Sequence, residues 1–207
     1  MMKKWYKSLS KRARNIYYFL GSLFIVGVLS GSLFYLLLNE TDKSMVINEV
    51  ARYFELVSSG ELNNVQVLRN ALIMNMTWVT VIYVLGMSVI GTPVVCFMNF
   101  IKGFVVGFSI SVILIQYKLY GIVLGFVYIT PHVLAMVVVT FILSFLAMQF
   151  SYYIVKNMFN NKSYNYKQAF RRYTKVYIFC IGVLILASIW EAFITPQIMR
   201  VFTLGMN

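Results

Sequence analysis

Side chains that carry acid–base, metal or nucleophile chemistry are scarce in this chain of 207 residues. The sequence contains one His, two Cys and six Asp or Glu residues, and five of these acids fall within residues 40–61. Proteases need a nucleophile with a base, paired acids or a set of metal ligands. The sequence contains neither an H-E-x-x-H motif nor a phosphate-binding G-x-x-x-x-G-K-[ST] motif. We therefore expect no enzyme activity, no cofactor and no metal site.

Charged residues are also few, whereas apolar residues dominate. They make up 12% and 60% of the chain, and the mean hydropathy is +0.78. A soluble domain is about 45–50% apolar, and a soluble core of this size could not bury the excess. The two cysteines, Cys96 and Cys180, lie inside apolar runs, which indicates small buried hydrophobes rather than a disulfide. Lipid must therefore be part of the solvent of this chain.

Long stretches without charge predict about five transmembrane helices, and hence an all-α polytopic membrane helix bundle that forms one domain over residues 1–207. At ~1.5 Å per residue, a helix of about 20 residues covers the ~30 Å apolar core of a bilayer. We place the crossings at about 16–38, 71–90, 94–115, once within 121–155, and 176–194. A tight turn at 91–93 joins the second and third crossings, and a short outer loop at 116–120 follows the third.

The run 121–155 is too long for one straight crossing, and Pro131 and His132 interrupt it. One alternative is a re-entrant half-helix over 121–130, followed by a full crossing from Pro131 to Val155. The other alternative is a single long kinked helix. A half-crossing must be buried in protein, because lipid cannot satisfy exposed backbone groups. We favour the half-helix, and both alternatives cross the membrane once.

Twelve of the 18 Lys and Arg residues lie in two blocks, one in the N-terminal residues 1–15 and one in the loop 156–175. Short loops rich in Lys and Arg stay in the cytoplasm, so an even number of crossings should separate the blocks. The N-terminus is therefore expected in the cytoplasm and the C-terminus outside. The blocks also account for the net charge of +12, which we assign to attraction by anionic lipid rather than to nucleic acid.

Residues 39–70 form the longest expected extracytoplasmic segment and the only acidic one, because five acidic and three basic residues leave it at −2. Four apolar residues recur there at helical spacing: Val46, Val50, Phe54 and Val57. This pattern predicts an amphipathic helix on the outer membrane surface, and Gly60 predicts its end. The apolar face either packs on the bundle or docks a partner protein, with Val50 and Phe54 as candidate contact residues.

Polar residues inside the predicted spans are the candidate functional residues. Lys102 lies near the middle of the third span, beside Asn99, Gly103 and Gly107. A charge there costs at least ~2.5–3.5 kcal/mol on insertion scales, and the small residues leave room for a second helix. Glu191 is the acid of the last span. The two charges pair directly or through a water, or else Glu191 lies near the outer headgroups while Lys102 contacts backbone carbonyls.

Each of the three prolines follows a threonine, at a place where a helix is expected to end or break. Pro93, Pro131 and Pro196 therefore predict helix starts or interruptions, because proline lacks a backbone donor. His132 follows one of them, and no cysteine or acid stands near it in sequence. We expect this histidine to cap a helix or to hydrogen-bond inside the bundle.

Small residues recur along the first span, where Gly27 and Gly31 form a G-x-x-x-G pair. Small residues at this spacing let another helix approach closely. The pattern predicts a packing face, used either inside the bundle or between copies in a homo-oligomer.

Three segments resemble the stage II sporulation protein M family. They are 91–108, which contains Asn-Phe-Ile-Lys-Gly, then 128–134, which contains Thr-Pro-His, and 191–196, which reads Glu-Ala-Phe-Ile-Thr-Pro. Their order and spacing also match, so with the basic N-terminus the resemblance covers nearly the whole chain. Broader relatives often carry an acid shortly after the Pro-His element, whereas residues 133–136 here are Val-Leu-Ala-Met. A transport role that depends on that acid is therefore not expected.

The resemblance implies a membrane protein of endospore-forming bacteria, present at the sporulation septum and in the engulfing mother-cell membrane. It would anchor a complex with stage II sporulation proteins D and P, which cut peptidoglycan, and would act as a scaffold that localises them. The alternative is a small transporter or permease-like subunit, in which Lys102, Asn99 and Glu191 line a polar path.

The expected topology can be tested with a reporter that is active only outside the cell. Fusions after Asn207 or within 44–60 should be active, and a fusion within 160–165 should be silent, because Lys and Arg hold that loop in the cytoplasm. An active fusion in the basic loop would overturn the five-span arrangement.

Overall fold

Every regular element in the described residues of the computed structural model is helical. The structure describes residues 11–159 and 166–198. The elements are α2 (Lys11–Leu37), α3 (Glu40–Ser59), α4 (Asn64–Gly86), α5 (Gly91–Phe159), α6 (Tyr166–Ile189) and the π-helix η1 (Trp190–Ile194). The prediction of an all-α fold is therefore confirmed.

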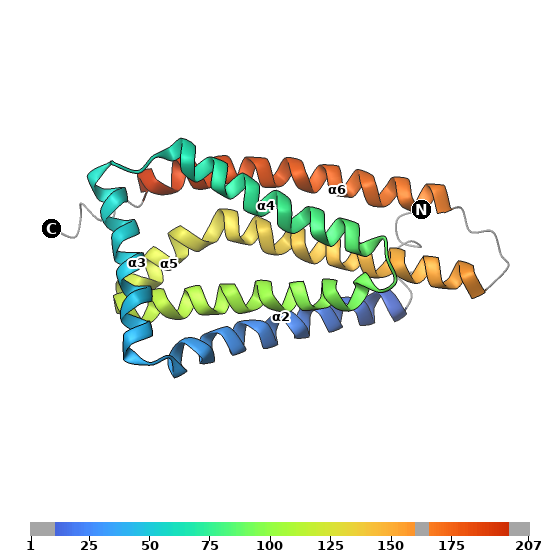
Figure 1. The fold of residues 1–207 in the computed structure, drawn as a ribbon, viewed down its shortest axis with the longest axis horizontal. Coiled ribbons are helices and arrows are strands. Elements are labelled where there is room, and N and C mark those ends of the chain that lie inside the picture. Colours follow the sequence, from blue (N-terminus) through green and yellow to red (C-terminus); the bar gives the residue numbers. More distant parts are fainter. Residues whose placement is uncertain (1–10, 160–165, 199–207) are drawn as a thin grey trace.

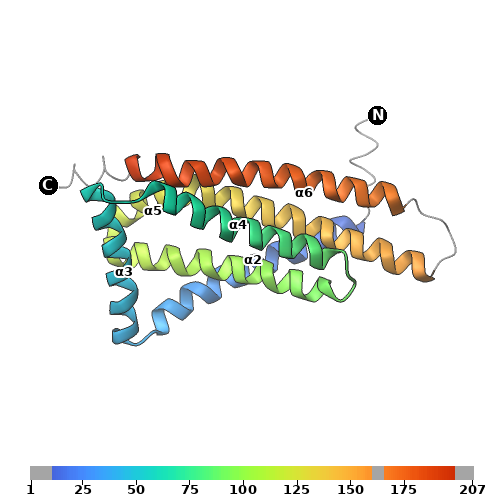
Figure 2. The ribbon, with the colours of Figure 1, turned by 45° about the horizontal axis from the view of Figure 1, so that its top comes forward.

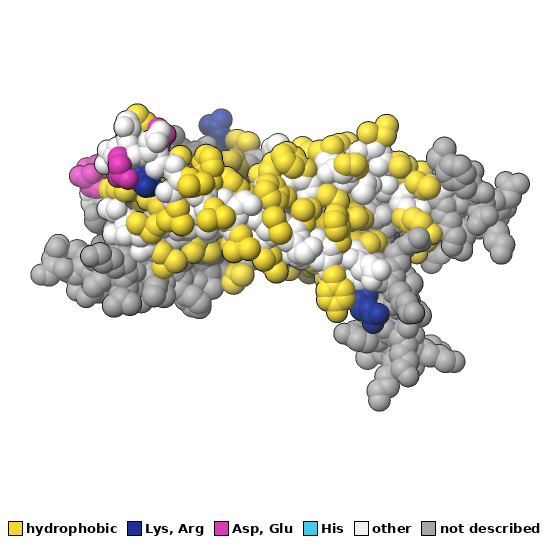
Figure 3. Space-filling view, turned by 90° about the horizontal axis from the view of Figure 1, so that it is seen from below, with side chains coloured by type: hydrophobic (Ala, Val, Ile, Leu, Met, Phe, Trp, Pro, Cys, Tyr) yellow, Lys and Arg dark blue, Asp and Glu magenta, His cyan; other side chains and the backbone are white. Residues whose placement is uncertain are grey.

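Five stretches in the described residues are long and apolar enough to cross a membrane. They are Ala13–Leu37, Asn64–Gly86, Gly91–Gln116, His132–Val155 and Lys167–Ile198. Apolar side chains cover the length of the bundle, and acidic side chains gather at one end (Figure 3). Large apolar residues such as Leu37 and Phe179 are 80% and 71% exposed. Lipid solvates such a surface, so the five stretches match the five predicted crossings in number and order. Two bounds differ most, because the second stretch begins at 64 within the predicted outer segment 39–70, and the last begins at 167 within the predicted loop 156–175.

Helix α5 carries two of these crossings because it folds back on itself. A straight helix of its 69 residues would be about 104 Å long. Instead, its light-green first part and its gold last part run side by side in opposite directions (Figures 1 and 2). Thr92 Oγ1 donates a hydrogen bond to Ser151 Oγ over 2.9 Å, and Cys96 Sγ lies 3.9 Å from Met148 Sδ. The reversal therefore lies within residues 117–131.

The backbone stays helical through this reversal, which corrects two predictions. Residues 116–120 are helical rather than a loop, and the helix is not broken at Pro131. The run 121–155 thus follows the long kinked helix and not the half-helix that we favoured. Unmade backbone hydrogen bonds are costly at membrane depth, so the chain changes direction while it keeps its helical bonding. The side chain of Pro131 lies outside the described residues.

The crossings place α3 at one end of the bundle and the described parts of the basic segments, 11–15, 156–159 and 166–175, at the other (Figures 1 and 2). Helix α2 begins at the end where α5 finishes and α6 starts, and the turn between α4 and α5 lies there too. Met87 N–H donates to Val84 O, and Ser88 N–H donates to Leu85 O, in that turn. Four crossings separate the start of α2 from the end of α5, the even number that the basic blocks require.

Helix α3 lies across the end of the bundle, roughly perpendicular to the spans (Figures 1 and 2). Glu40 and Asp42 lie in its first turn, where the positive end of the helix dipole stabilises negative side chains. Gly60 follows the helix with φ 78°, a left-handed conformation that glycine adopts readily. The predicted amphipathic helix and its end at Gly60 are therefore confirmed.

One part of the apolar face of α3 is buried in the bundle, and another part lines a cavity. Val57 is buried, with 3% of its surface exposed, so this part of the face packs on the bundle. Val46 and Val50 are half-buried and line a cavity against α5. The side chain of Phe54 lies outside the described residues.

Glycines of α2 bring this helix against the first part of α5. A methyl group added at Gly27 would overlap the carbonyl oxygen of Phe100, and one added at Gly31 would overlap that of Phe104. The G-x-x-x-G pair of the first span is therefore a packing face within the chain.

Glycines of α5 complete the same contact from the other side. Added methyl groups at Gly103 and Gly107 would overlap the carbonyl oxygens of Phe24 and Val28 in α2. Ser32 Oγ in α2 also donates to Gly107 O over 3.2 Å. Each helix thus offers two glycines to the backbone of the other, so we call this contact the glycine interlock (Gly27, Gly31, Gly103 and Gly107).

Aromatic and hydroxyl side chains join α4 to α6 on the other side of the bundle. The rings of Tyr83 and Tyr177 stack with centroids 4.0 Å apart. Tyr83 Oη and Thr174 Oγ1 are 2.9 Å apart, and Thr80 Oγ1 and Tyr177 Oη share a second hydrogen bond of 2.9 Å. Cys180 is buried in this core, and both cysteines are free thiols, as the sequence predicts.

Replacing Gly31 or Gly107 with Ala should lower the thermal stability of the detergent-solubilised protein. The added methyl group meets backbone rather than a movable side chain, and overpacking of this kind costs about 1–3 kcal/mol. Gly21→Ala is the matched control in α2, because nothing lies within 4 Å of its added methyl. Equal unfolding midpoints for Gly31→Ala and Gly21→Ala would show that the interlock does not hold the fold.

Candidate functional site

The last span changes its helical winding at Glu191, which lies in η1. Thr195 N–H donates to Trp190 O, five residues back, as in a π-helical turn. Pro196 comes next and has no backbone donor, which favours this wider winding. π-Helical turns are rare and often occur at functional sites. The Thr-Pro pair signalled a helix end in the sequence but not this change in winding.

The wider turn brings Glu191 against His132 of α5. Their Oε1 and Nε2 atoms are 3.5 Å apart, and the two side chains are 23% and 11% exposed. The contact joins the end of the fifth crossing to the start of the fourth. His132 thus interacts inside the bundle as expected, but its partner lies 59 residues away in the sequence. Local spacing could not identify that partner, because the folding back of α5 creates the contact.

Lys102 lies over an aromatic ring, and the charge of Glu191 is close enough to act on it. Its Nζ lies 5.7 Å from the ring centroid of Trp78 in α4, within cation–π distance. Among the described residues, Lys102 forms neither an ion pair with Glu191 nor a hydrogen bond to a backbone carbonyl. The direct ion pair and the contact with backbone carbonyls are therefore not formed, although the charges of Lys102 and Glu191 act on each other. The compact helix packing places an indole ring within its reach, and the acid finds a closer partner in His132.

Two buried asparagines tie neighbouring helices together. Asn99 Nδ2 donates to Leu20 O over 2.9 Å, which joins α5 to α2. Asn75 Nδ2 donates to Ser188 Oγ over 3.0 Å, which joins α4 to α6. Buried polar groups must be hydrogen-bonded to avoid a desolvation penalty. Asn99 therefore serves the α2–α5 contact, and Asn75 is a polar residue inside a predicted span that we had not singled out.

The other predicted residues have packing or helix-end positions. Gly103 and Gly107 form the α5 side of the glycine interlock. Pro93 lies in the first turn of α5, where its missing donor leaves no helical bond unmade. Pro196 is buried just after η1. These two glycines and two prolines therefore do not form one contact network with Lys102, His132 and Glu191.

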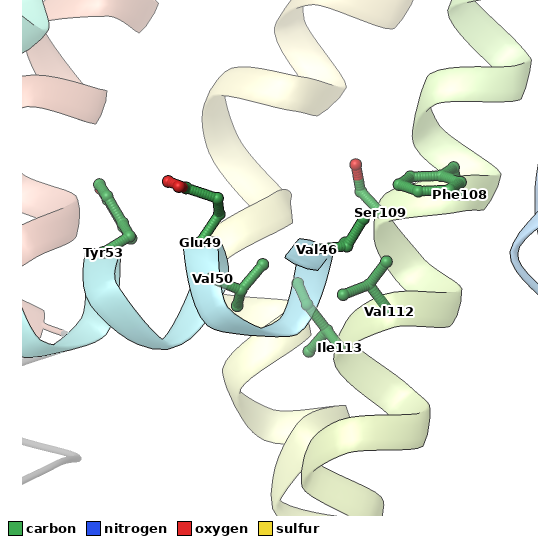
Figure 4. A pocket seen from close by; sticks show the side chains of 8 residues that line it. All are labelled: Val46, Glu49, Val50, Tyr53, Phe108, Ser109, Val112 and Ile113. Carbon is green, nitrogen blue, oxygen red and sulfur yellow. The ribbon is translucent and has the colours of Figure 1, made fainter. Parts of the chain in front are cut away.

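A cavity of about 310 Å³ lies between α3 and the first part of α5. Its lining residues are Val46, Glu49, Val50 and Tyr53 from α3, and Phe108, Ser109, Val112 and Ile113 from α5. In Figure 4 the side chains of the two helices face one another across this space, and the carboxylate of Glu49 points away from Val112 and Ile113. The sequence predicted Val50 as a contact residue but could not show the opposite wall.

The buried polar contacts are suited to holding helices together. The contacts of Glu191 with His132, of Lys102 with Trp78, and the two asparagine bonds each join different helices. In the part of the chain that the structure describes, no group of three or more His, Cys, Asp or Glu side chains is placed so that it could hold a metal ion. The cavity beside α3 is one place in the described residues that offers space to another molecule.

Five apolar stretches long enough to cross a membrane, joined by polar contacts inside the bundle, define a polytopic α-helical membrane protein. The family model for stage II sporulation protein M matches residues 20–196. The chain therefore belongs to this family, which confirms the resemblance seen in the sequence and identifies a membrane protein of sporulation. Comparison with curated proteins and with solved structures found no match.

A double-mutant cycle should measure the coupling between His132 and Glu191. His132→Ala and Glu191→Gln should each lower stability, and their effects should be non-additive by about 0.6–1.7 kcal/mol, the range of polar contacts between membrane helices. Thermal unfolding in detergent provides the measurement. His132→Ala combined with Glu61→Gln is the control, because exposed Glu61 lies outside the spans. Additivity in both pairs would show that the contact contributes nothing to stability.

Proposed function

We propose that this protein is a non-catalytic membrane scaffold that recruits and localises peptidoglycan-remodelling proteins during forespore engulfment. The partners expected from the family resemblance are stage II sporulation proteins D and P. The scaffold would lie in the sporulation septum and the engulfing mother-cell membrane, with its N-terminus in the cytoplasm and its C-terminus outside. Family membership supports the coarse role in sporulation, and the structure supplies the surface that a scaffold needs.

The observation that carries the proposal is the position of α3. This acidic helix lies across the bundle end instead of crossing the membrane (Figure 1). The topology expected from the basic blocks puts that end outside the cell, on the side where peptidoglycan lies. Helix α3 presents exposed Asp42 and Glu49 and the adjacent cavity on this side. A protein anchored here could hold extracytoplasmic partners at the membrane surface.

The interior of the bundle supports the same role. Its polar side chains join pairs of helices through the contacts described above. Interactions of this kind stabilise helix association in lipid, where apolar packing gains little over contact with lipid tails. A rigid bundle would hold α3 in a fixed position for a partner.

Transport is the second candidate function, and one observation favours it. Thr140 Oγ1 and Ser144 Oγ are buried on the same face of α5, and neither has a hydrogen-bond partner within the described residues. Buried polar groups inside a membrane often mark a path for an ion or a solute. Uptake of labelled ions or small solutes into vesicles that contain the purified protein would favour transport over the scaffold.

The proposal can be tested in a sporulating, endospore-forming host that lacks this protein. Deletion should stop the septal membrane from engulfing the forespore, and affinity-tagged protein should co-purify with the D and P proteins. Fluorescent fusions of D and P should also leave the septum in the deletion strain. Normal engulfment with correctly placed D and P proteins would overturn the scaffold proposal.

Lys102→Leu should separate membrane insertion from function. The variant should insert at least as well as the native protein, because a charge inside a span costs about 2.5–3.5 kcal/mol on insertion scales. Engulfment should nevertheless fall, since the contact of Lys102 with Trp78 ties α5 to α4. Lys167→Leu is the control, because Lys167 is exposed at the start of the last span. Normal engulfment with Lys102→Leu would make this charge a tolerated feature without a role.

A further inference from the structure

The cavity between α3 and α5 combines apolar walls with an acidic edge. Val46, Val50, Val112 and Ile113 supply aliphatic surface on both sides. Its volume of about 310 Å³ lies at the lower end of the range for ligand pockets, about 300–1,000 Å³. A space of this kind suits a few apolar groups, and leaving it unfilled forfeits van der Waals contacts.

The charge beside the cavity is negative and is not paired with another side chain of the described residues. Glu49 is exposed, and within the described residues it has no hydrogen-bond or ion-pair partner. The neighbouring Glu40 differs, because Lys43 Nζ lies 3.1 Å from its Oε1. Five of the six acids of the chain fall within 40–61. An occupant with a positive charge next to its apolar group would therefore complement this edge, whereas an anionic one would be repelled.

The position of the cavity limits what can reach it. Its α5 wall lies at 108–113, in the last turns of the span Gly91–Gln116. Its α3 wall belongs to the helix that lies across the end of the bundle (Figures 1 and 4). The cavity is therefore level with the end of a crossing, where a second membrane helix beside the bundle would emerge from the lipid.

We propose that this cavity docks the emerging end of a partner's amphipathic helix, which inserts apolar side chains and sets a Lys or Arg against Glu49. This mode resembles other helices that place apolar anchors in a groove. The inference deepens the scaffold role and rests on it, because it specifies the chemistry of the partner at this surface.

Synthetic single-span peptides in phosphatidylcholine vesicles test the inference directly. One peptide carries, after its apolar span, an outer flank with Leu at i, i+3, i+4 and i+7 and Lys at the positions between, which forms an amphipathic helix. Its matched control carries Glu in place of Lys. Energy transfer between a labelled peptide and the labelled protein reports binding. The Lys peptide should bind about tenfold more tightly than the Glu peptide, because the two share the same Leu anchors and differ only in the charge set against the acidic edge. Equal binding of the two peptides would overturn the proposal.

Two variants with matched controls locate the binding. Val50→Trp should fill the cavity and weaken binding of the Lys peptide about tenfold or more, since the apolar anchors lose their space. Val65→Trp is its control, because Val65 is 70% exposed at the start of α4, away from the cavity lining. Glu49→Lys should also weaken binding severalfold, whereas Asp42→Lys, outside the cavity lining of the same helix, should change it much less. Binding that none of the four variants changes would place the peptide elsewhere.

The competing occupant of the cavity is a lipid, which a change of the vesicle lipid tests. Replacing phosphatidylcholine with phosphatidylethanolamine offers an amine headgroup without any peptide. Loss of peptide binding in those vesicles, restored at higher peptide concentration, would assign the cavity to an amine lipid and overturn the proposal.

The outcome also separates this inference from the scaffold role. If Glu49→Lys loses the Lys peptide but still co-purifies with the D and P proteins, the scaffold stands and the cavity is not its docking site. If the native protein binds the Lys peptide but neither D nor P co-purifies with it, those partners are wrong, and a different membrane protein must supply the basic helix.

Discussion

The close approach of α2 and the first part of α5 is the constraint on which the rest of the structure depends. Lipid solvates apolar side chains as well as another helix does, so helices associate in a bilayer through close packing and polar contacts. The glycine interlock permits that packing. Because α3 follows α2 directly, the interlock also fixes where α3 begins relative to α5. The cavity between α3 and α5 is thus a consequence of the same contact.

The polar contacts in the bundle have a related physical origin. A polar side chain inside the membrane gains most when it pairs with a group of the protein, and several such side chains here contact a neighbouring helix. Asn99 selects α2, Asn75 selects α6, and Lys102 selects the ring of Trp78 in α4. Together with the contact of Glu191 with His132, they hold five crossings in a defined arrangement. The same residues that look costly in the sequence therefore specify which helices meet.

The two ends of the bundle differ in charge and in shape. The described parts of the basic segments, 11–15, 156–159 and 166–175, flank the spans at one end (Figure 1), while acidic side chains gather at the other end (Figure 3). Basic segments interact with anionic lipid and fix orientation. Helix α3 instead offers an acidic surface with an apolar cavity. This asymmetry separates membrane anchoring from partner binding in the proposed scaffold, so changes in α3 need not disturb the spans.

The sequence by itself determined the number of crossings, the helix over 40–59 and the placing of both basic segments at one end, because length, hydropathy and charge are local properties. The family resemblance was also carried by local motifs. Only the tertiary structure decided that α5 stays helical while it reverses, that Glu191 contacts His132, and that Lys102 faces Trp78. The cavity beside Val50 is likewise a feature that only the tertiary structure decided. These features join residues far apart in the chain, so they depend on how the helices pack, which spacing along one helix does not encode.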